Sequence, residues 1–96
     1  MTGYVLSPRA QADLDDIWDY TEQRWSAAQA ERYIRQLWQG IEYVASEPRR
    51  GDACDDIRAG CHKYSAGSHV IFFRITAAGI DVVRILHGSM DFGRHF

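Results

Sequence analysis

The sequence predicts an α+β domain in which a hairpin of two helices packs on one face of a small, mainly antiparallel β-sheet. Two stretches, 8–24 and 26–46, repeat apolar side chains every three or four residues, which indicates helices with one buried face. Two later apolar runs, 70–75 and 80–86, are joined by a short loop and indicate a β-hairpin. The predicted order is strand, helix, helix, strand, strand, strand, within a single domain over residues 1–96.

The chain begins with a short apolar strand, residues 4–6, that leads directly into the first helix. Ser7 is a favourable N-cap residue, and Pro8 is well tolerated at the first helical position. Acidic side chains occupy the positions that we expect to face solvent. The predicted buried stripe of this helix consists of Ala10, Leu14, Ile17, Trp18, Thr21 and Trp25.

The second helix begins after Ser26, which forms a capping box with Gln29 three residues later. Pro48 cannot continue the hydrogen-bond ladder, so we expect the helix to end near Ser46 or Glu47. The connection between the helices is so short that they must form an antiparallel hairpin. The predicted buried face consists of Ala30, Tyr33, Ile34, Leu37, Trp38, Ile41, Val44 and Ala45.

The remaining segments deliver the chain to the sheet. Residues 49–59 are polar and predict a loop, residues 61–65 a strand and residues 66–68 a turn. Residues 76–79 predict the central hairpin loop, in which Gly79 can take a positive φ. The last residues, 88–96, show no clear period and predict a tail or a short turn of helix.

The central hairpin is apolar on both faces. Ile71, Phe73 and Ile75 alternate with Val70, Phe72 and Arg74, and the second run alternates Ile80, Val82, Arg84 and Leu86 with its other residues. The helices can cover only one face of the sheet. We therefore expect the other face to remain an exposed apolar groove that receives a partner.

Charge and cysteine content narrow the class of protein. Residues 1–47 carry eight acids and four arginines, a net −4, whereas residues 48–96 carry seven bases and five aspartates, a net +2. This asymmetry hints at an acidic partner for the second half. Cys54 and Cys61 do not have the spacing of a redox or zinc motif and predict two reduced, structural thiols. Without a signal segment or a membrane-length apolar run, a soluble cytoplasmic protein is expected.

The residues do not indicate a cofactor, a metal site or a catalytic nucleophile. The four histidines lack metal-ligand spacing, and no glycine-rich phosphate loop or nucleophile elbow is present. Metal-free RNA cleavage stays open, because it needs only a base, an acid and converging cations. The side chains available for it are Arg58, Lys63, Arg74, Arg84, His87 and Arg94. Solvated charges, or anchors for an acidic peptide, are the alternative interpretation.

A series of segments in a specific order resembles the ParE toxins of the RelE/ParE superfamily. The resemblance covers nearly the whole chain, and its most specific part is a strand followed by an I-L-H-x-x-M-D block. The segments are Leu6-Ser7-Pro8, Ala12 to Tyr20, Pro48-Arg49-Arg50-Gly51, Ile57-Arg58, His69 to Arg74, Val83 to His87 and Met90-Asp91. The resemblance implies the same helical hairpin on a small sheet that the periodicities predict.

The resemblance also implies a function. It suggests the toxin of a type II toxin–antitoxin pair, held inactive by a ParD-type antitoxin, acting on DNA gyrase to block replication and contacting DNA only through the antitoxin. A partner segment of this kind orders on binding. We expect it to contact Arg58, Tyr64, His69, Phe73 and Arg74. We expect gyrase to contact Arg84, His87, Met90, Asp91 and Arg94.

One departure from the family pattern concerns Gly88 and Ser89, where ParE-like sequences commonly carry a basic residue before the Met-Asp pair. This leaves two alternatives beside gyrase inhibition. One is a RelE-like, ribosome-dependent mRNA endonuclease, and the other is an attenuated toxin that acts mainly as a corepressor with its antitoxin. The absence of a dense Lys, Arg and His cluster favours a protein that binds its target without catalysis.

Overall fold

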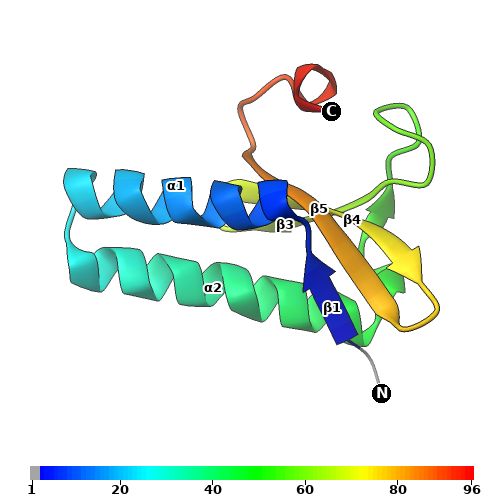
Figure 1. Ribbon diagram of the computed structural model, residues 1–96, viewed down its shortest axis with the longest axis horizontal. Coiled ribbons are helices and arrows are strands. Elements are labelled where there is room, and N and C mark those ends of the chain that lie inside the picture. The colour runs from blue at the N-terminus through cyan, green and yellow to red at the C-terminus, as the bar shows by residue number, and fades with distance from the viewer. Residues whose placement is uncertain (1–2) are drawn as a thin grey trace.

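The computed structural model describes residues 3–96 and confirms a two-layer α+β fold, with two helices on one face of a five-stranded sheet (Figure 1). The helices and strands agree closely with the predicted ranges. Their bounds are β1 Gly3–Leu6, α1 Pro8–Arg24, α2 Ala27–Ser46, β2 Asp52–Ala53, β3 His62–Ala66, β4 His69–Thr76 and β5 Gly79–His87. Two short 3-10 turns, η1 Pro48–Arg50 and η2 Phe92–His95, complete the chain.

The strands lie in the order β1-β5-β4-β3-β2, and every neighbouring pair except one is antiparallel. β1 pairs in parallel with β5, with Tyr4 opposite Ile80. A parallel neighbour requires a long crossover, and the helical hairpin between β1 and the rest of the sheet supplies the length. The prediction of a mainly antiparallel sheet is therefore confirmed.

Both helices begin at the predicted caps. The Ser7 hydroxyl accepts the Ala10 N–H at 3.0 Å, and the Ser26 hydroxyl accepts the Gln29 N–H at 3.1 Å. Gln29 does not complete the predicted capping box, because its side-chain oxygen accepts a hydrogen bond from Arg32 instead. The second helix ends at Ser46, as Pro48 predicts.

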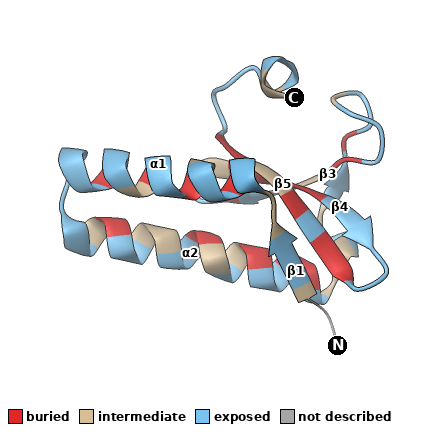
Figure 2. Cartoon of the chain, viewed as in Figure 1, coloured by how far each residue is buried: buried red, intermediate tan, exposed pale blue. Residues whose placement is uncertain are grey.

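The main core lies between the helices and the sheet (Figure 2). Leu37 and Ile41 of α2 meet Ile71 and Phe73 of β4, and none of these four side chains is exposed. Phe73 was predicted to contact a partner, and that prediction is wrong, because its side chain faces the helices and lies wholly inside the core.

A β-bulge in β5 changes the predicted alternation of its side chains. Phe72 pairs with Arg84 whereas Phe73 pairs with Val82, so Val83 is an extra residue on β5. Before the bulge Ile80 and Val82 face the helices, and after it Ile85 does. The prediction that Leu86 shares a face with Val82 is wrong for this reason.

The second face of the sheet is covered, which corrects the expectation of an open apolar groove there. Val70, Phe72 and Leu86 form a second cluster with both cysteines. The 54–61 loop lies over this cluster, and Phe92 and Phe96 of the tail place their rings edge-on against Phe72, at 4.8 and 5.1 Å between centroids. The sequence pattern could not show this cover, because neither covering segment is periodic.

The connections are tighter than predicted. Only Gly67 and Ser68 separate β3 from β4, and Gly67 has a φ of 59°. Thr76 pairs with Gly79, so the central hairpin also has a two-residue loop. A Cβ on Gly79 would lie 1.9 Å from the Gly3 oxygen, because β1 passes close to it. The predicted loop 49–59 contains η1 and the short edge strand β2.

Figure 1 shows that the helical hairpin extends past the sheet at the end where α1 connects to α2. Trp25 lies in this connection and is 69% exposed, so its predicted place in the core is wrong. Trp25 is the C-cap of α1 and directly precedes Ser26, the N-cap of α2, so its side chain does not follow the periodicity of the helix. Trp18 and Trp38 are partly buried, and Trp38 packs against the main core as predicted.

Candidate functional site

The overhanging ends of the two helices form one wall of an open groove of about 480 Å³. The other wall comes from the turn between β3 and β4, the end of β5 and the residues that follow it. Three residues predicted to be functional meet here. The lining consists of Asp16, Ile17, Tyr20, Thr21, Trp25, Gln29, Tyr33, Ser68, His69, His87 and Met90. We refer to it as the overhang groove.

Tyr33 of α2 ties the helices to the sheet at the floor of this groove. Its hydroxyl accepts the Ser68 N–H at 2.9 Å and lies 2.6 Å from His69 Nδ1. Because the hydroxyl accepts from Ser68, its own proton can be donated to Nδ1, which requires the neutral imidazole. The ring also lies against Gly67, where an added Cβ would lie 2.8 Å from it. The tight β3–β4 turn thus depends on Tyr33.

His69 and His87 lie opposite each other at the ends of β4 and β5, with ring centroids 5.3 Å apart and the rings edge to face. Burial of His69 and the neighbouring His87 lower the pKa of His69 from 6.5 to about 4, whereas Asp13 raises it slightly. His69 is therefore neutral near pH 7. Its Nδ1 accepts the hydrogen bond from Tyr33, and the ring adds no positive charge to the groove.

Gly88 and Ser89 form a turn that returns the chain to the groove. The Gly88 N–H donates to the Ser68 oxygen at 2.9 Å, and the Met90 N–H donates to the His87 oxygen at 3.0 Å. Ser89 donates its N–H to His87 Nδ1 at 3.1 Å, and its hydroxyl lies 2.7 Å from the same atom. This turn places Met90, 43% exposed, against the groove.

The electrostatic character of the overhang groove is acidic. Asp16 lines it, and no lysine or arginine occurs among its described lining residues. The ion pairs found within residues 3–96 do not involve Asp16. The carboxylate of Asp16 favours a bound cation over a phosphate, and the apolar side chains of the lining favour apolar groups.

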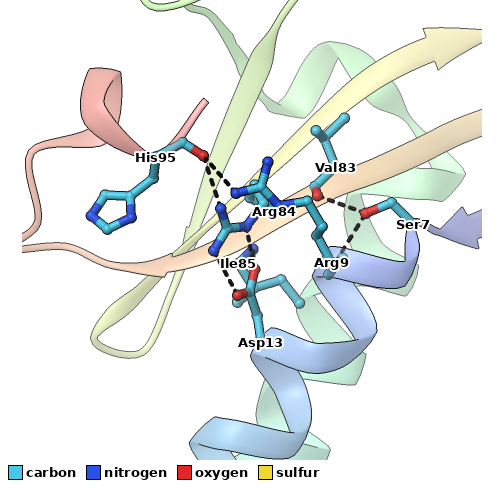
Figure 3. A network of polar contacts seen from close by, with 8 residues as sticks. Ser7, Arg9, Asp13, Val83, Arg84, Ile85 and His95 are labelled. Atoms are coloured by element: carbon cyan, nitrogen blue, oxygen red, sulfur yellow. Dashed lines mark hydrogen bonds and ion pairs between the residues drawn. The ribbon is translucent and has the colours of Figure 1, made fainter.

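Next to the groove, Asp13 and Arg84 form a largely buried ion pair in which each side chain is 12% exposed (Figure 3). Arg84 donates to both Asp13 oxygens at 2.8 Å, and to the His95 oxygen at 2.8 Å. Its hydrogen bonds with Asp13 raise the pKa of Arg84, against the opposing effect of burial. The charge of Arg84 is therefore compensated by Asp13 within the protein, which counts against its predicted contact with gyrase.

The same network provides hydrogen-bond partners for the backbone of β5 beyond the point where β1 ends. The Ser7 hydroxyl donates to the Val83 oxygen at 2.7 Å, and the Ile85 N–H donates to Asp13 at 2.9 Å. β1 stops opposite Val82, so the first turns of α1 supply the partners that a longer strand would have provided.

The other predicted site residues are distributed over separate regions. Arg58 is exposed in the 54–61 loop and Arg74 is exposed on β4. Tyr64 packs against Tyr43 with centroids 5.6 Å apart and lines a separate hollow of about 350 Å³. Asp91 and Arg94 are exposed at the tail. The residues predicted to bind the antitoxin and those predicted to bind gyrase therefore come together in the overhang groove, where His69 lies beside His87 and Met90.

The sequence interpretation missed the contribution of the helices to this site. Tyr20, Trp25 and Tyr33 line the groove together with Asp16, yet only strand and tail residues were predicted there. The position of Trp25 just before the cap Ser26 was the available signal, because a side chain in a connection does not belong to the buried stripe.

The two cysteines are free thiols buried in the second cluster, as predicted. Burial, followed by a hydrogen bond with Cys61, raises the pKa of Cys54 to about 12. A thiol of this kind stays protonated and is a poor nucleophile. Within residues 3–96 no three His, Cys, Asp or Glu side chains are grouped to hold a metal ion. None of the helices in this part of the chain has the length and apolar character needed to cross a membrane.

Comparison with known sequences gives a consistent result. The family model described as the ParE toxin of the type II toxin–antitoxin system parDE matches residues 4–92. The chain is 55% identical over 93 residues to toxin ParE1 of Mycobacterium tuberculosis, covering 96% of this chain and 95% of that protein. It is 45% identical over 95 residues to toxin ParE1 of Caulobacter vibrioides, covering 99% and 98%.

A more distant relative is toxin ParE of Escherichia coli, 37% identical over 93 residues and covering 95% of this chain and 89% of that protein. Among solved structures, the chromosomal ParDE TA system from P. aeruginosa contains a chain that superposes with a TM-score of 0.79. It covers 91% of this chain and 96% of its own length at 18% identity, which supports the fold.

Proposed function

The chain belongs to the ParE toxin family of type II toxin–antitoxin systems, and from this we propose that it is neutralised by a ParD-type antitoxin and acts by binding DNA gyrase rather than by catalysis. The observation that carries the binding mechanism is the overhang groove. It is lined by aromatic and apolar side chains and an aspartate, and it brings His69, His87 and Met90 together. A groove with this lining suits a segment of another protein.

The two facing imidazoles of His69 and His87 resemble an acid and base pair, which is one requirement of RNA cleavage without a metal. Cleavage without a metal needs cations that stabilise the pentavalent phosphorane. The described lining of the groove holds Asp16 and contains no lysine or arginine, and Arg84 is paired with Asp13. A phosphate in this groove would lie near a carboxylate and would find no lysine or arginine in the described lining, which favours protein binding over RNA cleavage.

Controlled expression in bacteria tests the toxin and antitoxin roles. We expect the protein alone to stop growth and to cause replication arrest, and co-expression of the cognate ParD-type antitoxin to restore growth through a complex that co-purifies. Normal growth in the absence of the antitoxin, with folded protein present, would contradict a toxin and favour a corepressor.

A substitution in the groove should distinguish a toxin that acts by binding from one that acts by catalysis. Replacing His69 by glutamine removes one imidazole of the facing pair but retains a hydrogen-bond acceptor for Tyr33. We expect the His69→Gln variant to remain toxic, because no proton transfer is required. A loss of toxicity of several orders of magnitude in a variant that still binds antitoxin normally would instead indicate an enzyme.

A further inference from the structure

The wall of the overhang groove that the helices form has the residue composition of a cation-binding site. Asp16 and Tyr20 lie one turn apart on α1 and both line the groove, as does Trp25 in the connection that follows the helix. Tyr33 adds a third aromatic ring from α2. Aromatic rings beside a carboxylate attract a cation through the ring faces and through the opposite charge.

None of the ion pairs within residues 3–96 neutralises the carboxylate in this wall. The two neighbouring acids of α1 have different surroundings: Asp13 is paired with Arg84, whereas Asp16 belongs to none of the ion pairs within residues 3–96. His69, which is neutral near pH 7, accepts the Tyr33 proton at Nδ1, so it carries its own proton on Nε2 and contributes no charge. The negative charge of Asp16 is thus available to a bound group.

The apolar part of the lining restricts the kind of cation. Ile17 and Met90 line the groove beside the aromatic rings, and the Thr21 hydroxyl donates to the Ile17 oxygen at 2.7 Å, which leaves its methyl group for contact. A lysine or arginine side chain matches this lining, because its aliphatic stem packs on apolar surface while its charged end meets rings and carboxylate. The molecule holds one such contact already, with Arg50 stacked 4.0 Å from the Tyr43 ring centre.

We propose that the overhang groove binds an arginine or lysine side chain from a segment of the antitoxin, with Asp16 as its counter-ion and Tyr20 and Trp25 as its aromatic walls. The inference rests on the proposed function for the identity of the partner and adds the chemistry of the contact. Asp16 gives the surface of the groove a negative charge. A segment that carries basic residues complements this surface, in contrast to the acidic segment predicted from the second half of the chain.

The test measures the affinity of the full-length cognate antitoxin for variants of the groove by titration calorimetry at two salt concentrations. Asp16→Lys should weaken binding at least about tenfold, and Trp25→Leu about threefold to tenfold. Asp19→Lys is the matched control, because it makes the same change of charge on the same helix at an exposed residue that does not line the groove. It should change affinity less than about twofold. Circular dichroism confirms that each variant is folded, which is expected because Asp16 and Trp25 are exposed.

A charge exchange identifies the bound residue. Each basic residue of the antitoxin is changed to glutamate, and one of these variants should recover affinity for the Asp16→Lys toxin while losing it for the wild type. Wild-type affinity of both Asp16→Lys and Trp25→Leu, or no recovery by any antitoxin variant, would overturn the inference and leave the toxin–antitoxin pairing intact. An antitoxin that does not bind even the wild-type toxin would instead refute the proposed function.

Discussion

Asp13 holds three parts of the molecule together through one carboxylate. It pairs with Arg84, accepts the Ile85 N–H beside the bulge, and through Arg84 fixes the His95 oxygen of the tail. Breaking a buried pair by removing one charge leaves the other charge without compensation. This explains why Asp13 differs in function from the neighbouring acids of α1, which are solvated.

The first prediction concerns this carboxylate. Replacing Asp13 by asparagine should lower the free energy of unfolding by about 2–3 kcal/mol, because Arg84 then stays largely buried without a counter-ion. Urea denaturation measures the change. The control Asp15→Asn removes the same charge from an exposed position and should shift stability by less than about 0.5 kcal/mol. Equal effects of the two substitutions would refute a special role for the pair.

His69 predicts a pH dependence of stability. Its pKa in the folded protein is about 4, below the ordinary 6.5. Between these two pH values the unfolded chain therefore binds a proton at His69 that the native state does not bind. The stabilisation is therefore fully present above about pH 6.5 and is lost progressively as the pH falls toward 4. Thermal denaturation over this range should show a smaller decline for His69→Gln than for the wild type. Parallel curves would mean that His69 does not titrate abnormally.

At the scale of elements, the tail has a structural role. Phe92 and Phe96 cover Phe72 on the face of the sheet that the helices leave free. Replacing both phenylalanines by alanine should cost about 2 kcal/mol of stability, since two partly buried rings are lost. Arg94→Ala, on the same turn but exposed, should be nearly neutral. Unchanged stability of the double variant would show that the tail is not docked in solution.

Two tryptophans of the helical hairpin provide a second test at this scale. Trp38 packs on the main core and lies 5.8 Å from the Tyr4 ring, whereas Trp25 is 69% exposed. Trp38→Ala should therefore destabilise by about 2–3 kcal/mol and Trp25→Ala by less than about 0.5 kcal/mol. The reverse order in denaturant titrations would contradict the overhang.

The elements themselves followed from local signals. Ser7-Pro8, Ser26 and Pro48 mark helix boundaries by hydrogen bonding and sterics within a few residues, so each was predictable. The bulge at Val83 was not, because the oxygen of the extra residue bonds to Ser7 at the start of α1, which lies far away in sequence. The burial of Phe73 and the cover over Phe72 likewise depend on which segments pack on each face.

At the scale of the whole molecule, the candidate site is a product of assembly. His69, His87 and Met90 were predicted to be functional but assigned to two different partners, and the fold places them in one groove. The aromatic wall from α1 and α2 was missed, because the helical repeat alone does not show that the hairpin extends past the sheet. A site formed between layers requires the relative placement of those layers, which periodicity does not contain.

The measurement that tests the account most directly uses the purified protein, released from its antitoxin, in a DNA supercoiling assay with gyrase beside an mRNA cleavage assay with translating ribosomes. We predict loss of supercoiling with intact RNA, and restored supercoiling when the antitoxin is added. Cleaved RNA with normal supercoiling would contradict the account, and the facing imidazoles of His69 and His87 would then be the first residues to examine as catalytic groups.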